Sequence, residues 1–119
     1  MLIIDDSSTM RHWLAAIVDD LGAETEQAAD GAAALELLGR RPPFDLALVD
    51  WDMPRMNGIE FVRAVRRLPQ FADLKLMMVT SHNAIEDVRA ALESGADDFL
   101  MKPLDAGMMG DKLRTLGLL

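Results

Sequence analysis

The amino-acid sequence predicts one α/β domain whose core is a parallel β-sheet. Short apolar runs alternate along the chain with longer segments in which apolar residues recur at helical spacing, and this alternation is typical of βα units. The 119 residues, half of them hydrophobic, suffice for one compact domain and leave no room for a second of ordinary size. We therefore expect a single domain that covers residues 1–119.

The expected strands are five apolar runs at 2–4, 24–28, 46–49, 74–79 and 99–101. The second run is only weakly apolar, as an edge strand can be. In open α/β sheets, ligands bind in the crevice at the carboxyl ends of the strands, where the strand order reverses. The residues that follow each run are therefore the first candidates for a functional site.

Capping residues mark the first three helices. Residues 7–9, all Ser or Thr, offer N-caps to a segment with apolar residues at helical spacing, which Gly22 ends. Asp30 can cap a second helix, and Asn57-Gly58 opens a third. Three of the five βα units thus have a defined helix start.

The fourth and fifth helices are predicted from their spacing and their ends. The fourth ends near Gly95 and is indicated by apolar residues at helical spacing, at Ile85, Val88 and Leu92. The fifth follows Pro103 and contains Gly107 and Gly110. Because each glycine costs about 1 kcal/mol relative to Ala inside a helix, we expect the fifth helix to be the least stable.

Composition excludes several classes of function. The net charge of −8 leaves no basic stripe to neutralise a nucleic acid backbone, so we expect no direct DNA or RNA binding. The absence of Cys excludes disulfides, thiolate metal sites and cysteine nucleophiles, and is compatible with a reducing cytoplasm. Apolar runs are short and soon interrupted by charge. We expect a soluble cytoplasmic protein without membrane insertion.

Charged and hydroxyl side chains follow four of the five expected strands. Asp5 and Asp6 come after the first run, Asp50 after the third, Thr80 after the fourth and Lys102 after the fifth. The parallel topology brings these ends to one rim of the sheet. Three carboxylates, a hydroxyl and an ammonium group are therefore expected to converge.

This set of side chains suits magnesium and phosphoryl chemistry. Mg²⁺ takes oxygen ligands, and Asp6 and Asp50 can supply them directly while Asp5 holds a coordinated water. The cation also keeps Asp50 ionised among like charges. An ionised Asp50 can attack phosphorus, Lys102 can offset charge on the transferring oxygens, and Thr80 can donate a hydrogen bond to one of them.

Four motifs in this order resemble the response regulator receiver family. They are Ile3-Ile4-Asp5-Asp6, Val49-Asp50-Trp51-Asp52-Met53-Pro54, Met78-Val79-Thr80-Ser81 and Lys102-Pro103. The resemblance covers essentially the whole chain. Ser8-Thr9-Met10-Arg11 and the Asp-Trp-x-Met-Pro run look most like the stand-alone chemotaxis regulators.

The resemblance implies a flavodoxin-like receiver fold, with a doubly wound five-stranded sheet of order 2-1-3-4-5 flanked by five helices. It also implies that Asp50 is the phosphoacceptor, that Thr80 and Lys102 contact the phosphoryl group, and that Asp52 gives its backbone carbonyl to the metal. Phe99 takes the place of the aromatic switch residue, and the Lys102-Pro103 bond is expected to be cis.

Partners follow from the same resemblance. A histidine kinase or a phosphotransfer protein is expected to donate the phosphoryl group. A downstream protein target is expected on the face formed by the fourth helix, fifth strand and fifth helix. The domain is then not an enzyme acting on other substrates, but a phosphoacceptor that phosphorylates and dephosphorylates itself.

Two positions depart from the family's usual pattern. Asp52 lies two residues after the acceptor and His82 lies two residues after Thr80, at places where the side chain tunes phosphoryl lifetime by steering the attacking water. Asp52 can repel a donor or orient water, and His82 can attract phosphate or face solvent. The sequence alone leaves both pairs of alternatives open.

Two other classes of protein compete with the receiver. A phosphatase of the haloacid dehalogenase type also uses an Asp-x-Asp run, which Asp50-Trp51-Asp52 satisfies. In those enzymes that run comes first and the acidic pair last, which is the reverse of the order here. The second alternative is a receiver-like interaction module that needs no phosphorylation, and the presence of all five site residues argues against it.

Overall fold

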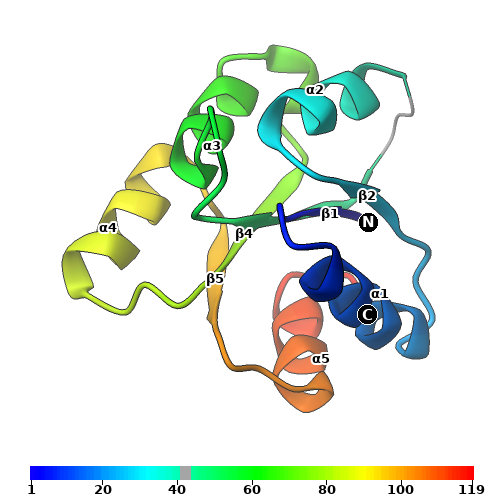
Figure 1. Ribbon diagram of the computed structural model, residues 1–119. Coiled ribbons are helices and arrows are strands. Elements are labelled where there is room, and N and C mark those ends of the chain that lie inside the picture. The colour runs from blue at the N-terminus through cyan, green and yellow to red at the C-terminus, as the bar shows by residue number, and fades with distance from the viewer. Residues whose placement is uncertain (41–43) are drawn as a thin grey trace.

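The computed structural model describes residues 1–40 and 44–119, in which a parallel sheet lies between two layers of helices (Figure 1). The elements alternate in the order β1 (Leu2–Ile4), α1 (Ser8–Asp20), β2 (Glu26–Ala28), α2 (Gly31–Arg40), β3 (Leu46–Asp50), α3 (Gly58–Arg66), β4 (Lys75–Thr80), α4 (Ile85–Ser94), β5 (Asp98–Met101) and α5 (Ala106–Thr115). A short 3₁₀ turn, Pro69–Phe71, precedes β4. The predicted succession of five βα units is confirmed.

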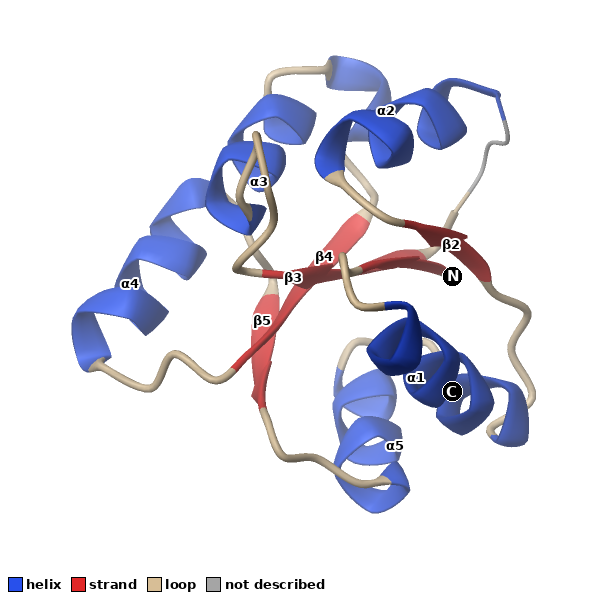
Figure 2. Cartoon of the chain, in the orientation of Figure 1, coloured by secondary structure: helices blue, strands red, loops and turns tan. Residues whose placement is uncertain are grey.

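The strand order is β2-β1-β3-β4-β5, and every neighbouring pair is parallel (Figure 2). The chain passes from β1 to β2 on one side and then returns to place β3 on the other side of β1. This is the expected order. The winding reverses between β1 and β3, so their carboxyl ends border the crevice in which such folds bind ligands.

Alternate residues of each central strand face opposite helix layers. In β3, Ala47 and Val49 pack into the core under α2, α3 and α4, whereas Leu46 and Leu48 pack into the core under α1 and α5. Because both faces are covered, residues 46–49 of the strand are an uninterrupted apolar run. Full burial of a Val or Leu side chain in this strand contributes about 1.5 to 3 kcal/mol.

Capping groups begin the helices where the sequence predicts. The Ser7 side chain accepts a hydrogen bond from the Met10 backbone N–H, and the Asp30 carboxylate accepts one from Ala33. Asn57 and Glu60 form a reciprocal capping box at the start of α3. These bonds satisfy N–H groups that have no partner within the first turn.

Helix α4 is correctly predicted, but its apolar spacing does not mark its buried face. The side chains of Ile85 and Leu92 are 74% and 46% exposed, and Ala91 is the residue of α4 that is buried. Gly95, with φ of +117°, ends the helix in the left-handed conformation that favours glycine. The helix therefore presents apolar side chains to solvent beside the edge strand β5.

No helix in the described part of the chain has the length and apolar character needed to cross a bilayer.

Candidate functional site

Three carboxylates meet at the carboxyl ends of β1 and β3. Asp5 and Asp6 follow β1, and Asp50 is the last residue of β3, one position further than the sequence predicts for that strand. One carboxylate oxygen from each lies within 4.8 Å of the other two. Asp5 and Asp50 are buried, whereas Asp6 is exposed. Two carboxylates of the cluster are therefore buried, and the third is open to solvent.

Lys102 brings a positive charge into this cluster. Its Nζ lies 3.2 Å from Asp50 Oδ1 and 3.5 Å from Asp5 Oδ2. The Lys102 backbone N–H donates to the Thr80 carbonyl at 2.8 Å, which ties the loop after β5 to the end of β4. The Lys102-Pro103 bond is cis, as expected. The two ionic contacts of Lys102 therefore join the ends of β1, β3 and β5.

The environment of Asp50 disfavours its charge. Burial first and the Asp5 charge second raise the pKa of Asp50 from 3.8 to about 6, against the opposing attraction of Lys102 and with a further contribution from Asp6. One ammonium group does not neutralise three carboxylates. A divalent cation within reach of the same oxygens would restore the ionised form of Asp50.

Thr80 lies on the strand next to Asp50. Asp50 pairs with Val79 in the register between β3 and β4, so Thr80 follows one position later, as the last residue of β4. Its side chain is buried, and its Oγ1 accepts a hydrogen bond from the backbone N–H of His82 at 2.9 Å. In the described residues the hydroxyl thus contacts the following loop and no carboxylate.

Asp52 and His82 form a pair outside the buried cluster. His82 Nε2 lies 3.0 and 3.1 Å from the two Asp52 carboxylate oxygens, and the His82 ring stacks on Trp51 with centroids 4.5 Å apart. His82 Nδ1 lies 3.5 Å from Asp87. Burial alone would lower the pKa of His82. Asp52 and Asp87 outweigh this effect through their hydrogen bonds and their negative charges, so the pKa is raised above 6.5. Of the alternatives left open, His82 does not simply face solvent.

Phe99 lies on edge strand β5, away from the carboxylates. Its ring is half-buried against the core under α2, α3 and α4. Lys112 from α5 lies over the ring with Nζ 5.9 Å from its centroid, and the same Nζ contacts Asp98 at 2.9 Å. The aromatic side chain therefore lies on the face of the sheet that α4 covers, and the Lys112 ammonium group reaches it from α5.

Some contacts at the site escape sequence reasoning. The Arg11 guanidinium donates to the Asp5 backbone carbonyl at 2.6 Å and to Gln27 at 3.3 Å, which holds the acidic loop against β2. Asp87, the second acidic partner of His82, is the other omission. Both residues lie in the first turns of helices that follow strand ends at the site, and this placement could have found Asp87. Arg11 also stands in the Ser8-Thr9-Met10-Arg11 motif, although no contact was expected from it.

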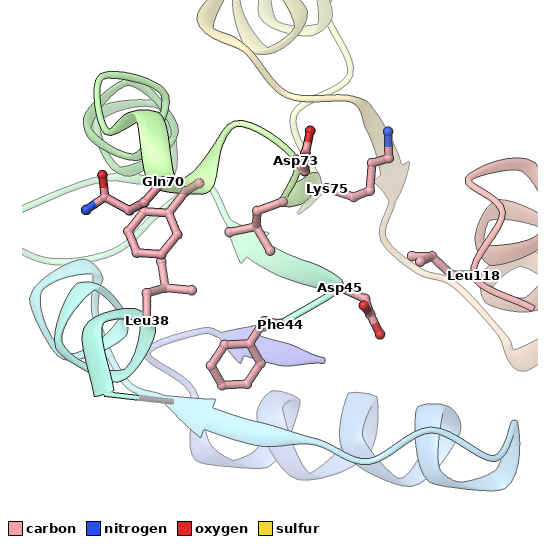
Figure 3. Close-up of a pocket in the computed structure, with 9 residues that line it drawn as sticks. Leu38, Phe44, Asp45, Gln70, Asp73, Lys75 and Leu118 are labelled. Carbon is pink, nitrogen blue, oxygen red and sulfur yellow. The ribbon is translucent and has the colours of Figure 1, made fainter. Parts of the chain in front are cut away.

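A separate apolar cavity of about 370 Å³ lies at the opposite edge of the sheet (Figure 3). Phe44 and Leu38 line one side, and Leu118 borders it near the start of β3 and β4. None of the predicted site residues lines this cavity. The chemistry-bearing groups are thus at the carboxyl edge, as predicted from the strand ends.

Comparison with known proteins defines the family. The family model for the response regulator receiver domain matches residues 1–114 of this chain. The chain belongs to this family. The chain is 35% identical to the chemotaxis protein CheY of Pseudomonas aeruginosa, over 98% of this chain and 94% of that protein, and 33% identical to a CheY homolog of Campylobacter jejuni, over 98% and 90%. The structure of Vibrio cholerae CheY4 superposes with a TM-score of 0.90 at 33% identity, covering 97% of this chain and 95% of that one.

This receiver is a two-component response regulator of the CheY-like type. Receivers of this type are phosphoacceptor signalling domains. Receivers pair with histidine kinases and with downstream targets. The comparisons do not favour the dehalogenase-type phosphatase or the phosphorylation-independent module.

Proposed function

We propose that Asp50 accepts a phosphoryl group from a phosphohistidine and that Asp5, Asp6, Thr80 and Lys102 complete the site. The observation that carries this proposal is the position of Lys102 Nζ, 3.2 Å from Asp50 within a group of three carboxylates. Asp50 thus has an adjacent cation that can contact the transferred group. The whole of residues 1–119 forms this one receiver domain.

The residues fit a resident Mg²⁺. Carboxylates of Asp5, Asp6 and Asp50 provide hard oxygen donors of the kind that this ion prefers. The Asp52 backbone carbonyl would be a further donor, as the family's pattern implies. The raised pKa of Asp50 supports the fit, because burial first and the Asp5 charge second disfavour the lone carboxylate, and a bound cation would offset both. When bound, the cation supplies positive charge beside the carboxylate and the transferring oxygens.

The chain's own groups divide the reaction between them. An Asp50 carboxylate oxygen attacks phosphorus, the new O–P bond forms, and the N–P bond breaks with its electron pair remaining on the donor imidazole. Lys102 stabilises charge on the phosphoryl oxygens, and the Thr80 hydroxyl donates a hydrogen bond to one of them. Water reverses the modification by attacking the acyl phosphate. The domain therefore acts on itself and turns over no separate substrate.

Asp52 and His82 tune the lifetime of the acyl phosphate. Because His82 binds both Asp52 oxygens at 3.0 and 3.1 Å, the two side chains act as a unit beside Asp50. The pairing reduces the repulsion that an isolated Asp52 carboxylate would exert on an incoming dianion.

The donor is a histidine kinase or a phosphotransfer protein, and the output is a protein that binds the face of α4, β5 and α5. The exposure of Ile85 and Leu92 supports this assignment, because apolar side chains on a partner face gain from burial. Phe99 adjusts that face when Thr80 turns toward the phosphoryl group. We place this exchange in the cytoplasm, without direct contact to nucleic acid.

The test is intact-mass analysis after treatment with an acyl phosphate, with and without Mg²⁺. We expect one added phosphoryl group on the natural sequence, none on Asp50→Asn, and none when the divalent cation is chelated. Asp20→Asn, which removes an exposed aspartate at the end of α1, is the matched control and should label fully. Undiminished labelling of Asp50→Asn would show that another carboxylate is the acceptor.

A further inference from the structure

His82 connects three separate segments around the site. Its ring stacks on Trp51 and binds Asp52 in the loop after β3, and its backbone N–H donates to Thr80 Oγ1 at the end of β4. Its other ring nitrogen lies 3.5 Å from Asp87 Oδ2, in the first turn of α4. A single side chain thus spans from the phosphoacceptor loop to a helix of the output face.

The start of α4 has little else to hold it. Its N-cap residue, Ala84, provides no side-chain hydrogen bond, so the first turn lacks the capping that begins α1, α2 and α3. Ile85 and Glu86 are exposed, and the buried residue of the helix, Ala91, lies nearly two turns later. In the part of the chain that the structure describes, the His82–Asp87 contact is the ionic tether of this turn.

We propose that His82 is a positioning residue that tethers the first turn of α4 to the phosphoacceptor loop, with Asp87 as its contact on the helix. This inference rests on the proposed function of Asp50 and names how that site controls α4. The inference assigns a role to Asp87, which the His82 side chain connects to the site.

The hydrogen bond to Thr80 makes the tether responsive to the site. When the Thr80 hydroxyl turns toward a phosphoryl oxygen, the His82 backbone loses the 2.9 Å bond that places it. The ring keeps its stacking on Trp51 and its short contacts with Asp52, so the longest contact, to Asp87, is the one that opens. The first turn of α4 is then released while the rest of the helix stays packed through Ala91.

Amide hydrogen exchange of residues 85–94, with and without beryllofluoride and Mg²⁺, tests the tether. Beryllofluoride stands in for the phosphoryl group. In the natural sequence, we expect beryllofluoride to speed exchange in the first turn of α4. In Asp87→Asn, the first turn should already exchange about two- to fivefold faster before beryllofluoride is added, as loss of a partly exposed ion pair gives, and should then change little.

Glu86→Gln is the matched control. It removes the same charge from the same turn, but Glu86 is exposed and the acidic partner of His82 on this turn is Asp87. Both variants therefore change the interaction with the helix dipole, whereas only Asp87→Asn removes the tether. Glu86→Gln should respond to beryllofluoride like the natural sequence, and Asp87→Glu, which keeps the charge, should recover much of the response. His82→Ala should reproduce Asp87→Asn, and the double variant should add nothing further.

The outcomes separate the tether from the proposed function. If beryllofluoride binds the natural sequence and acyl phosphate labels Asp50, but α4 exchanges alike in Asp87→Asn and Glu86→Gln, the tether is overturned and the phosphoacceptor assignment stands. If beryllofluoride produces no change anywhere in the natural sequence and no label reaches Asp50, both fall. Early release of α4 in Asp87→Asn alone, with labelling of Asp50 retained, supports both.

Discussion

Replacing Asp50 with Asn should stabilise the protein in metal-free buffer at neutral pH. The pKa of Asp50 rises from 3.8 to about 6 on folding. The folded state therefore takes up a proton between these pH values, and the free energy of unfolding falls as pH increases through this window. The difference corresponds to about 3 kcal/mol at pH 7.5, at 1.36 kcal/mol per tenfold change in acidity.

Asn removes the buried charge but also weakens the contact with Lys102, which keeps Asp5 as a partner at 3.5 Å. We therefore expect Asp50→Asn to raise the free energy of unfolding by about 1 to 3 kcal/mol at pH 7.5. At pH 4.5 the folded side chain is protonated but the unfolded one is still largely ionised, so the cost falls to about 1 kcal/mol. The gain from Asp50→Asn should therefore shrink by about 2 kcal/mol between pH 7.5 and pH 4.5.

Urea denaturation in chelator, followed by circular dichroism at both pH values, measures this difference. The control is Asp20→Asn, whose exposed side chain should change stability by no more than about 0.5 kcal/mol at either pH. Destabilisation by Asp50→Asn at pH 7.5, or an equal gain at both pH values, would refute the claim that buried charge repulsion at Asp50 costs stability.

The remaining predictions concern the metal, the backbone at the site and the switch. Mg²⁺ at a hundredfold excess over its Kd should stabilise the natural sequence by about 2.7 kcal/mol in thermal melts, and Asp6→Ala should lose most of this gain. Gly58→Ala should lower the free energy of unfolding by about 1 to 3 kcal/mol and reduce phosphoryl labelling, because the added Cβ would lie 2.4 Å from the Asp50 carbonyl oxygen. Its control is Gly39→Ala, where the added Cβ meets no neighbouring side chain or segment within 4 Å. Urea denaturation should show that Gly39→Ala raises the free energy of unfolding by about 0.5 to 1 kcal/mol. Thr80→Ala should leave Mg²⁺ affinity intact by calorimetric titration, yet weaken the beryllofluoride-induced change in exchange across residues 84–116; a full response would exclude Thr80 from the switch.

Several features could be predicted from the sequence because they depend on local pattern. Apolar runs and helical spacing identify the five βα units, and the caps at Ser7, Asp30 and Asn57 place the helix starts to within a residue. The rule that ligands lie at the carboxyl ends of parallel strands needs only the position of each strand end. The sequence alone therefore predicts that Asp5 and Asp50 lie together.

Orientation of a helix is a different matter, as α4 shows. Spacing says that Ile85 and Leu92 share a face, but it does not say which face meets the sheet. The structure buries the Ala91 side and leaves the larger side chains exposed. That choice is decided by packing against β5, which follows the helix directly, and against α3, which is distant in sequence.

The sequence by itself determined the fold class, the strand ends and the identity of the acidic and basic groups that meet there. Only the tertiary structure decided what those groups experience. The pKa of Asp50 depends on burial and on the charges of Asp5 and Lys102. His82 contacts Asp52, which lies 30 positions away along the chain. Such effects arise from distances between segments that are remote in sequence, and electrostatic interactions depend on those distances and on the exclusion of water, which no local pattern encodes.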